Sequence, residues 1–164
     1  MSGPKGDDRL RLDWLGGRYA VCRLDPAEQI PDWAGLGGPA ELTSITRTSE
    51  ELSIITSQDR VPEAVRAERG FVALRVRGPL DFALVGVLAR LSGALAGEGI
   101  PILAISTHDT DVLLVRIEEA ASAARALSRV AQIGGEPPFE GTSGARSSGR
   151  CEPAAEAPHP GAPG

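Results

Sequence analysis

Aromatic side chains are scarce in this chain of 164 residues: they make up 4% of it, whereas hydrophobic residues as a whole make up 41%. A core must therefore be built mainly from Leu, Val, Ile and Ala. An excess of basic residues is also missing, because the net charge is −5 with acids and bases mixed along the chain. Nucleic-acid binding normally needs a basic surface. We therefore expect no nucleic-acid partner.

Cysteines and long apolar runs are equally few. Cys22 and Cys151 are too few and too far apart for a disulfide framework or a zinc site, which predicts a reducing compartment. No apolar run reaches the roughly 18 residues needed to span a membrane. The first residues lack the apolar stretch of a signal peptide. These absences predict a cytoplasmic protein with no membrane partner.

Glycine and proline are concentrated at one end of the chain. Residues 134–164 contain thirteen of them, a share above the roughly 25–30% that marks low complexity. Such a segment buries too little apolar area to offset its ordering entropy. We predict a disordered Gly/Pro/Ala-rich tail at 134–164, a disordered N-terminus at 1–8, and a folded part at about 10–133.

Short alternating segments fill the first half of the folded part. The pair Gly16-Gly17 between two such segments predicts a β-hairpin. The expected elements are strands at 9–15, 19–24, 41–47 and 52–56, one helical turn at 31–35, and a short helix at 61–69.

The second half changes period. A strand at 71–77 precedes a helix at 82–97, in which leucine and valine recur at three- and four-residue spacing. Asp81 is placed to cap the start of this helix, and Gly97 and Gly99 to end it. Strands at 100–106 and 112–117 and an alanine-rich helix at 118–131 follow.

This order, β-α-β-β-α, is nearly a ferredoxin-like βαββαβ unit within an α+β fold. The last strand is not obvious, because 131–133 is short; it either comes from residues 10–24 or is absent. Residues 19–77 can form a second, degenerate unit that shares the strand 71–77. We predict two tandem units, at 10–70 and 71–133.

Several motifs resemble those of ACT domains. They are Gly-Pro-Leu-Asp-Phe at 78–82, Gly-Ile at 99–100, Ala-Ile-Ser-Thr-His-Asp-Thr-Asp at 104–111, Tyr-Ala-Val-Cys-Arg-Leu-Asp-Pro at 19–26 and Ser-Ile-Thr-Arg-Thr at 44–48. The chain is similar, over roughly 10–131, to the tandem-ACT branch that includes bacterial stand-alone ACT proteins and the cytosolic arginine sensors. The resemblance implies a regulatory, non-catalytic protein without cofactor or metal, which binds a free amino acid or similar small zwitterion at an interface between ACT units. It also implies a homodimer, and a protein partner whose activity is regulated.

The resemblance places the ligand at the loop after the first strand of the unit, at the start of the second strand, and at the following hairpin. The expected ligand-binding residues are Leu80, Asp81, Phe82, Ala83, Glu98, Gly99, Ile100, Pro101, Thr107, His108, Asp109, Thr110 and Asp111. Relatives often carry an acid at the position of Gly97 and an aromatic residue at that of His108, so this chain departs from the family pattern at both positions.

Elementary chemistry agrees with this placement. The N-terminus of the predicted helix offers N–H groups for a ligand carboxylate, and Asp109 or Asp111 can accept an ammonium group. Simpler explanations stand beside it: Asp81 as a helix cap, and Asp109-Thr110-Asp111 as turn chemistry. A divalent metal at His108, Asp109 and Asp111 would have a poor cage.

Two other functions stay open. One is a structural or protein-interaction module that kept the fold and lost its ligand. The other is an enzyme with Cys22 as nucleophile, which would need a base held nearby.

Overall fold

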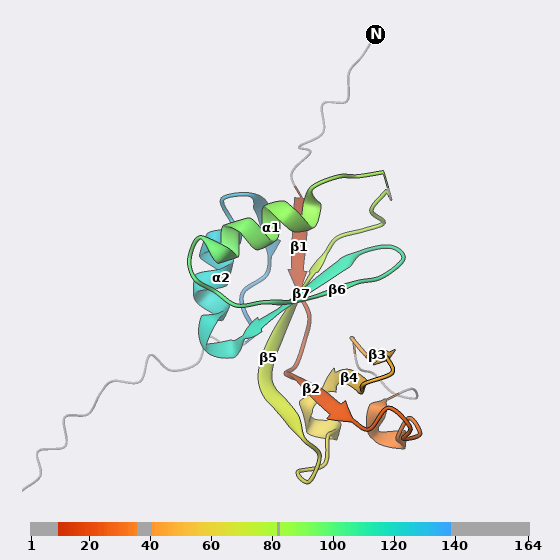
Figure 1. Ribbon diagram of the computed structural model, residues 1–164. Helices are drawn as coiled ribbons and strands as arrows, with labels where there is room; N and C mark the ends of the chain where they lie inside the picture. The colour runs from red at the N-terminus through yellow and green to blue at the C-terminus, as the bar shows by residue number, and fades with distance from the viewer. Residues whose placement is uncertain (1–9, 36–40, 82, 139–164) are drawn as a thin grey trace, which may run out of the picture.

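The computed structural model describes residues 10–35, 41–81 and 83–138 of the chain (Figure 1). The strands are β1 (Leu10–Trp14), β2 (Tyr19–Leu24), β3 (Ser44–Arg47), β4 (Leu52–Ser57), β5 (Ala67–Val76), β6 (Leu103–Ser106), β7 (Asp111–Arg116) and β8 (Ala131–Gly134). The helices are α1 (Val87–Ala96) and α2 (Ala120–Leu127), with 3-10 turns η1 (Asp32–Ala34), η2 (Gln58–Arg60) and η3 (Ile117–Glu119). Within these ranges no helix is long and apolar enough to cross a membrane.

The predicted disordered ends fall mostly outside the described residues. The tail was predicted to begin at Gly134, and this boundary is wrong, because Gly134 ends β8 and pairs with Asp13 of β1. The prediction for 1–8 and that for 139–164 concern residues outside the described ranges.

Strand β5 is the centre of an eight-stranded sheet (Figure 1). The first part of β5 pairs with β2, and its last part pairs with β1. Strand β7 pairs with β5 over Phe71–Arg75. Two strand orders therefore meet at β5: β3-β4-β2-β5 and β8-β1-β5-β7-β6.

The second order is that of a ferredoxin-like unit with one extra strand. The chain runs β5-α1-β6-β7-α2-β8, but β1 lies between β5 and β8. Strand β8 is parallel to β1, and β1 is antiparallel to β5. Residues 10–14 lie next to β5, where the last strand of such a unit stands, so the first of the two predicted alternatives is confirmed in part. The other alternative, that this strand is absent, is wrong, because residues 131–134 form β8 beyond β1.

The predicted hairpin at Gly16-Gly17 is wrong. Strands β1 and β2 do not pair with each other; both run antiparallel to β5, one after the other. The amide N–H of Leu15 donates to the carbonyl oxygen of Ala73 at 2.9 Å, which holds the connection against β5. Because β5 has ten residues, it has room for both strands on one side.

The predicted helix at 61–69 is also wrong. Residues 62–65 form a turn closed by Val65 N–H donating to the Pro62 carbonyl at 3.1 Å, and β5 begins at Ala67. Pairing with β2 overrides the helix propensity of this segment. The Arg69 side chain strengthens the turn by donating to the carbonyls of Val61 and Pro62. The helix predicted at 118–131 is shorter in the structure and begins after η3.

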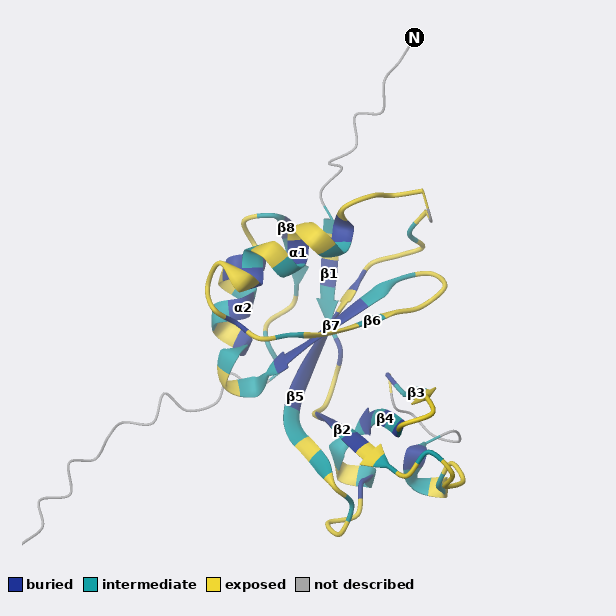
Figure 2. Cartoon of the chain, viewed as in Figure 1, coloured by how far each residue is buried: buried dark blue, intermediate teal, exposed yellow. Residues whose placement is uncertain are grey.

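Helices α1 and α2 cover one face of the sheet, and Figure 2 shows that β7 and the part of β5 that pairs with it are mostly buried. Residues alternate between the two faces of a strand. Val72, Leu74 and Val76 accordingly pack in one cluster with both helices. Phe71 and Ala73 belong to a second cluster, on the face that the helices do not cover.

Tyr19 anchors the break between β1 and β2. It is the only tyrosine of the chain, and it is 1% exposed. Its hydroxyl donates to the Gly16 carbonyl at 2.9 Å. Burial, and to a smaller extent the charge of Glu41, raise the pKa of Tyr19 to about 12, while Arg75 acts in the opposite direction.

This pKa predicts a loss of stability at high pH. Because the folded pKa lies above the ordinary value of 10.0, the neutral phenol stabilises the fold below pH 10, and this contribution of about 2–3 kcal/mol disappears as the pH rises toward 12. We expect the tyrosinate absorbance of the folded protein to appear near pH 12. Tyr19→Phe should remove the decline across this window. Titration of the folded protein at the ordinary pKa would contradict the prediction.

Candidate functional site

The loop between β5 and α1 forms the first wall of the candidate site. Helix α1 begins at Val87, so the predicted start at 82 and the predicted cap at Asp81 are both wrong. Gly86 precedes the helix with φ 82°, a left-handed conformation that breaks the helix and favours glycine. The Asp81 carboxylate instead accepts from the Ala83 N–H at 2.8 Å and closes a turn within the loop.

The hairpin between β6 and β7 forms the second wall. The Thr107 N–H donates to the Thr110 carbonyl at 2.8 Å, and the Ser106 hydroxyl donates to the Asp111 carboxylate at 2.5 Å. His108 Nδ1 lies 2.8 Å from Asp109 Oδ1. These bonds are the turn chemistry expected as the simpler explanation of the motif.

The two walls are bonded to each other. The Leu80 N–H donates to the Asp109 carbonyl at 2.8 Å, and the Thr110 hydroxyl donates to the Val76 carbonyl. Gly78 is required at this approach, because a Cβ there would overlap the Asp109 carbonyl oxygen. The loop and the hairpin are therefore held in one arrangement by backbone contacts.

A cavity of about 210 Å³ opens between these walls. Its lining includes six of the predicted residues: Leu80, Asp81, Thr107, His108, Thr110 and Asp111. Leu84, Val87 and Ser106 also line it and were not among the predicted site residues. The helical spacing of Leu84 and Val87 predicts core positions, and for this reason the sequence did not indicate that they line a cavity.

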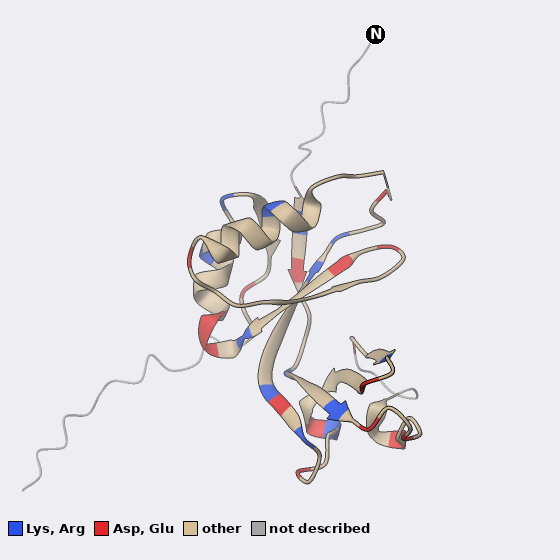
Figure 3. Cartoon of the chain, in the orientation of Figure 1, with Lys and Arg blue, Asp and Glu red and all other residues tan. Residues whose placement is uncertain are grey.

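The cavity has a carboxylate on each of its two walls. Figure 3 shows acidic positions on both the loop before α1 and the β6–β7 hairpin, and Asp81 and Asp111 are among the lining residues. Helix α1 starts at Val87 without a side-chain cap bond, and its first N–H groups lie outside the helical ladder. Val87, the first residue of α1, also lines the cavity, so the carboxylates of Asp81 and Asp111 lie near the helix N-terminus, an end that favours negative charge.

The remaining predicted residues lie elsewhere. Ile100 is buried after the far end of α1, whose ten residues place it about 15 Å from the cavity. Glu98 is paired with Arg129 at 2.6 Å. Gly99 follows the end of α1 with φ 70°, and Pro101 lines a different cavity. Within one copy, the segment 98–101 is not brought to Asp81 and Asp111.

Ala83 and Asp109 stand beside the cavity but do not line it. Phe82 is outside the described residues.

The described residues contain no group of three or more His, Cys, Asp or Glu side chains arranged to hold a metal ion. Cys22 is buried on β2, and burial raises the pKa of its thiol, with Arg69 acting in the opposite direction. A raised pKa lowers the fraction of thiolate at neutral pH, which is the reverse of what an activated nucleophile needs.

Comparison with known proteins decides the family. A sequence model of the ACT domain matches residues 66–129, and a separate model, of an N-terminal domain, matches residues 17–64. A protein from Agrobacterium tumefaciens of known crystal structure is 37% identical, with a TM-score of 0.71 over 77% of this chain and 92% of its own. The chain belongs to the ACT-domain family.

Other solved structures share the fold of this ACT protein. A Vibrio cholerae protein of unknown function, described as a possible transport protein, is 23% identical with a TM-score of 0.61, over 76% of this chain and 91% of its own. The aspartate kinase of Synechocystis is 15% identical with a TM-score of 0.56, over 82% of this chain and 29% of its own. No curated protein matches the chain. The ACT resemblance predicted from the sequence is confirmed.

Proposed function

We propose that this ACT protein is a regulatory, non-catalytic protein of the cytoplasm that binds a free amino acid or similar small zwitterion. The observation that carries the proposal is the cavity between the β5–α1 loop and the β6–β7 hairpin. A zwitterion carries one group of each sign a short distance apart. Its ammonium would lie at Asp81 or Asp111 and its carboxylate at the first turn of α1, where the helix offers N–H groups.

The proposal includes two tandem ACT units that share β5. The first order, β3-β4-β2-β5, has the sequence of neighbours of a ferredoxin-like unit in which the helices are reduced to η1 and η2. The match of residues 17–64 to a separate N-terminal domain supports this division. We place the boundary near residue 70, as the sequence predicts.

A homodimer would complete the ligand site. Strand β6 pairs only with β7 in the described part of the chain, so its other edge is available for pairing. In an antiparallel pair of β6 strands about a two-fold axis, Leu103 of one copy stands opposite the partner's Ser106. This pairing would bring the segment 98–101 of one copy toward the other copy's cavity, which accounts for predicted residues that one copy keeps apart.

The test is a thermal-shift screen of the purified protein against the twenty amino acids. A ligand at a hundred times its Kd should stabilise the protein by about 2.7 kcal/mol. Asp111→Ala should weaken the selected ligand at least about tenfold, because it removes a charge-assisted bond. Glu63→Ala, an exposed carboxylate replacement in the turn before β5, is the control and should leave the Kd unchanged.

Two outcomes would count against the proposal. A screen without any shift, together with a protein partner that copurifies, would favour an interaction module that lost its ligand. An unchanged Kd in a folded Asp111→Ala variant would remove the cavity from the site. Ligand would act by stabilising one arrangement of the units, which a regulated partner could then recognise.

A further inference from the structure

A second cavity, of about 370 Å³, lies where β2, β5, β7 and the segment before β6 come together. Its lining residues are Val21, Glu68, Phe71, Pro101, Ile102, Leu103 and Arg116. Small-molecule sites occupy about 300–1,000 Å³ and combine mostly apolar walls with a few polar groups. This cavity has five apolar residues, one carboxylate and one guanidinium, and its volume lies at the small end of that range.

A β-bulge in β5 shapes this cavity. Tyr19 is paired with Phe71, and Val21 with Glu68, so two steps along β2 correspond to three along β5. Gly70, with φ 83°, accommodates the extra residue. In a regular strand, side chains three residues apart point to opposite faces. The bulge instead brings Glu68 and Phe71 to the same cavity.

Arg116 is positioned by two contacts that do not involve Glu68. Its Nη1 donates to the Arg69 carbonyl at 2.7 Å, and its guanidinium carbon lies 4.2 Å from the centroid of the Phe71 ring. Its Nη2 is paired with the Glu68 carboxylate at 2.7 Å. The Glu68 side chain is 72% exposed, against 34% for Arg116. Another carboxylate can therefore replace that of Glu68 while Arg116 keeps its position.

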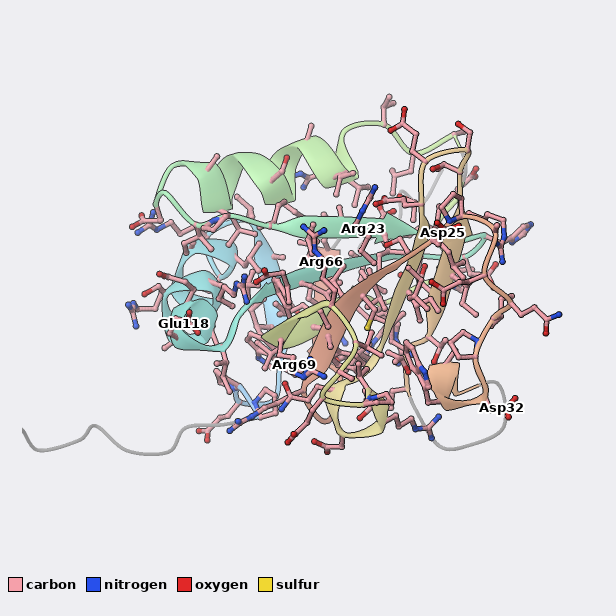
Figure 4. All side chains as sticks on the ribbon, turned by 60° about the horizontal axis from the view of Figure 1, so that its bottom comes forward. Arg23, Asp25, Asp32, Arg66, Arg69 and Glu118 are labelled. Carbon is pink, nitrogen blue, oxygen red and sulfur yellow. The ribbon has the colours of Figure 1, made fainter. Side chains whose placement is uncertain are left out.

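Other arginines lie near this part of β5 without lining the cavity. Arg69 directly follows Glu68, and the backbone N–H of Arg23 donates to the Arg66 carbonyl at 3.1 Å (Figure 4). The Arg23 side chain is paired with Glu51, and Arg116 is the arginine that lines the cavity in the described part of the chain.

We propose that this cavity binds a small monocarboxylate with an apolar body, whose carboxylate takes the place of Glu68 at Arg116. The apolar body would lie against Val21, Phe71 and Leu103. Within one copy this site is separate from the cavity at Asp81 and Asp111, and Pro101 is the residue of segment 98–101 that lines it. Binding here does not depend on that cavity binding a ligand. It joins β2, within the N-terminal match, to the segment before β6, within the ACT match.

The experiment titrates isocaproate into the full chain and follows backbone amide shifts by NMR. We expect saturable shifts at residues 21, 68–71, 101–103 and 116, and at least about tenfold weaker binding of isocaproamide, which has no charge. Arg116→Gln should weaken isocaproate at least about tenfold. Glu68→Gln should strengthen it, because the competing carboxylate is gone. A merely structural ion pair would not give opposite changes from its two members.

A third variant keeps the test independent of the ion pair. Val21→Trp should fill the cavity and block binding, whereas Ile30→Trp, at a position that is 43% exposed and outside the lining, should leave it unchanged. Equal binding of isocaproamide, shifts confined to residues 80–87 and 106–111, or no saturation would overturn the proposal. Leucine binding at least about tenfold more tightly than isocaproate, with loss of leucine binding in Glu68→Gln, would also overturn it, because the site would then select a zwitterion.

Discussion

Replacement of Leu74 by alanine should lower the free energy of unfolding by about 2–5 kcal/mol. Leu74 has no exposed area and lies on β5 between Trp14 of β1 and Leu113 of β7. It also packs in the cluster that joins the sheet to both helices. Removing its side chain leaves a cavity that strands on both sides are too constrained to close.

The control for this prediction is Leu84→Ala. Leu84 is 50% exposed and should change the free energy of unfolding by no more than about 0.5 kcal/mol. Urea denaturation measures both variants, and an unchanged slope with denaturant would establish that the stability itself has changed. A loss below about 1 kcal/mol for Leu74→Ala would contradict the described core.

Gly78→Ala should reduce both stability and ligand binding. The added Cβ would overlap the Asp109 carbonyl oxygen, a backbone atom that cannot move without displacing the β6–β7 hairpin. The Leu80–Asp109 bond between the two walls of the candidate site would then be stretched or lost. We expect a loss of about 1–3 kcal/mol in the free energy of unfolding. The amino acid selected by the screen should bind at least about tenfold more weakly.

Gly93→Ala is the matched control, because it makes the same chemical change with the opposite expected sign. Gly93 is exposed within α1, and apart from its chain neighbours and the backbone of its own helix no atom lies within 4 Å of an added Cβ. Alanine in a helix interior is favoured over glycine by about 1 kcal/mol. Calorimetry should therefore give a higher Tm for Gly93→Ala and a lower one for Gly78→Ala. Equal effects of the two variants would mean that the contact at Asp109 is unimportant.

Sequence periodicity predicted the parts of the fold that depend on local burial. The alternation in 71–77 and the helical spacing of Val87, Leu91 and Leu95 both appear in the structure as expected. The helix predicted at 61–69 is wrong because the residues of this segment favour a helix, whereas pairing with β2, which is distant in the sequence, makes part of the segment a strand. The hairpin predicted at Gly16-Gly17 is wrong for a similar reason. Strand β5 is long enough to pair with both β1 and β2, so these two strands do not pair with each other.

The candidate site was predicted in part for the same reason. The types and spacing of residues 107–111 indicate a polar hairpin, and the structure places a cavity beside it. The separation of Pro101 from Asp81 depends on how α1 lies across the sheet, which no local pattern encodes. The second cavity depends on one extra residue in β5, and a pairing register is a property of two strands together.

The insertion of β1 between β5 and β8 has a consequence for biosynthesis. Strand β1 is the first described strand to leave the ribosome, yet its partner β8 is the last. One edge of β1 stays unpaired in the nascent chain until nearly all of the described residues have been synthesised. An unpaired strand edge is prone to pair with other chains. Contacts between such distant residues also slow folding. A chain interrupted before Ala131 would keep that edge of β1 unpaired permanently. We therefore expect the edge of β1 to need protection during synthesis, although the finished fold covers it with β8.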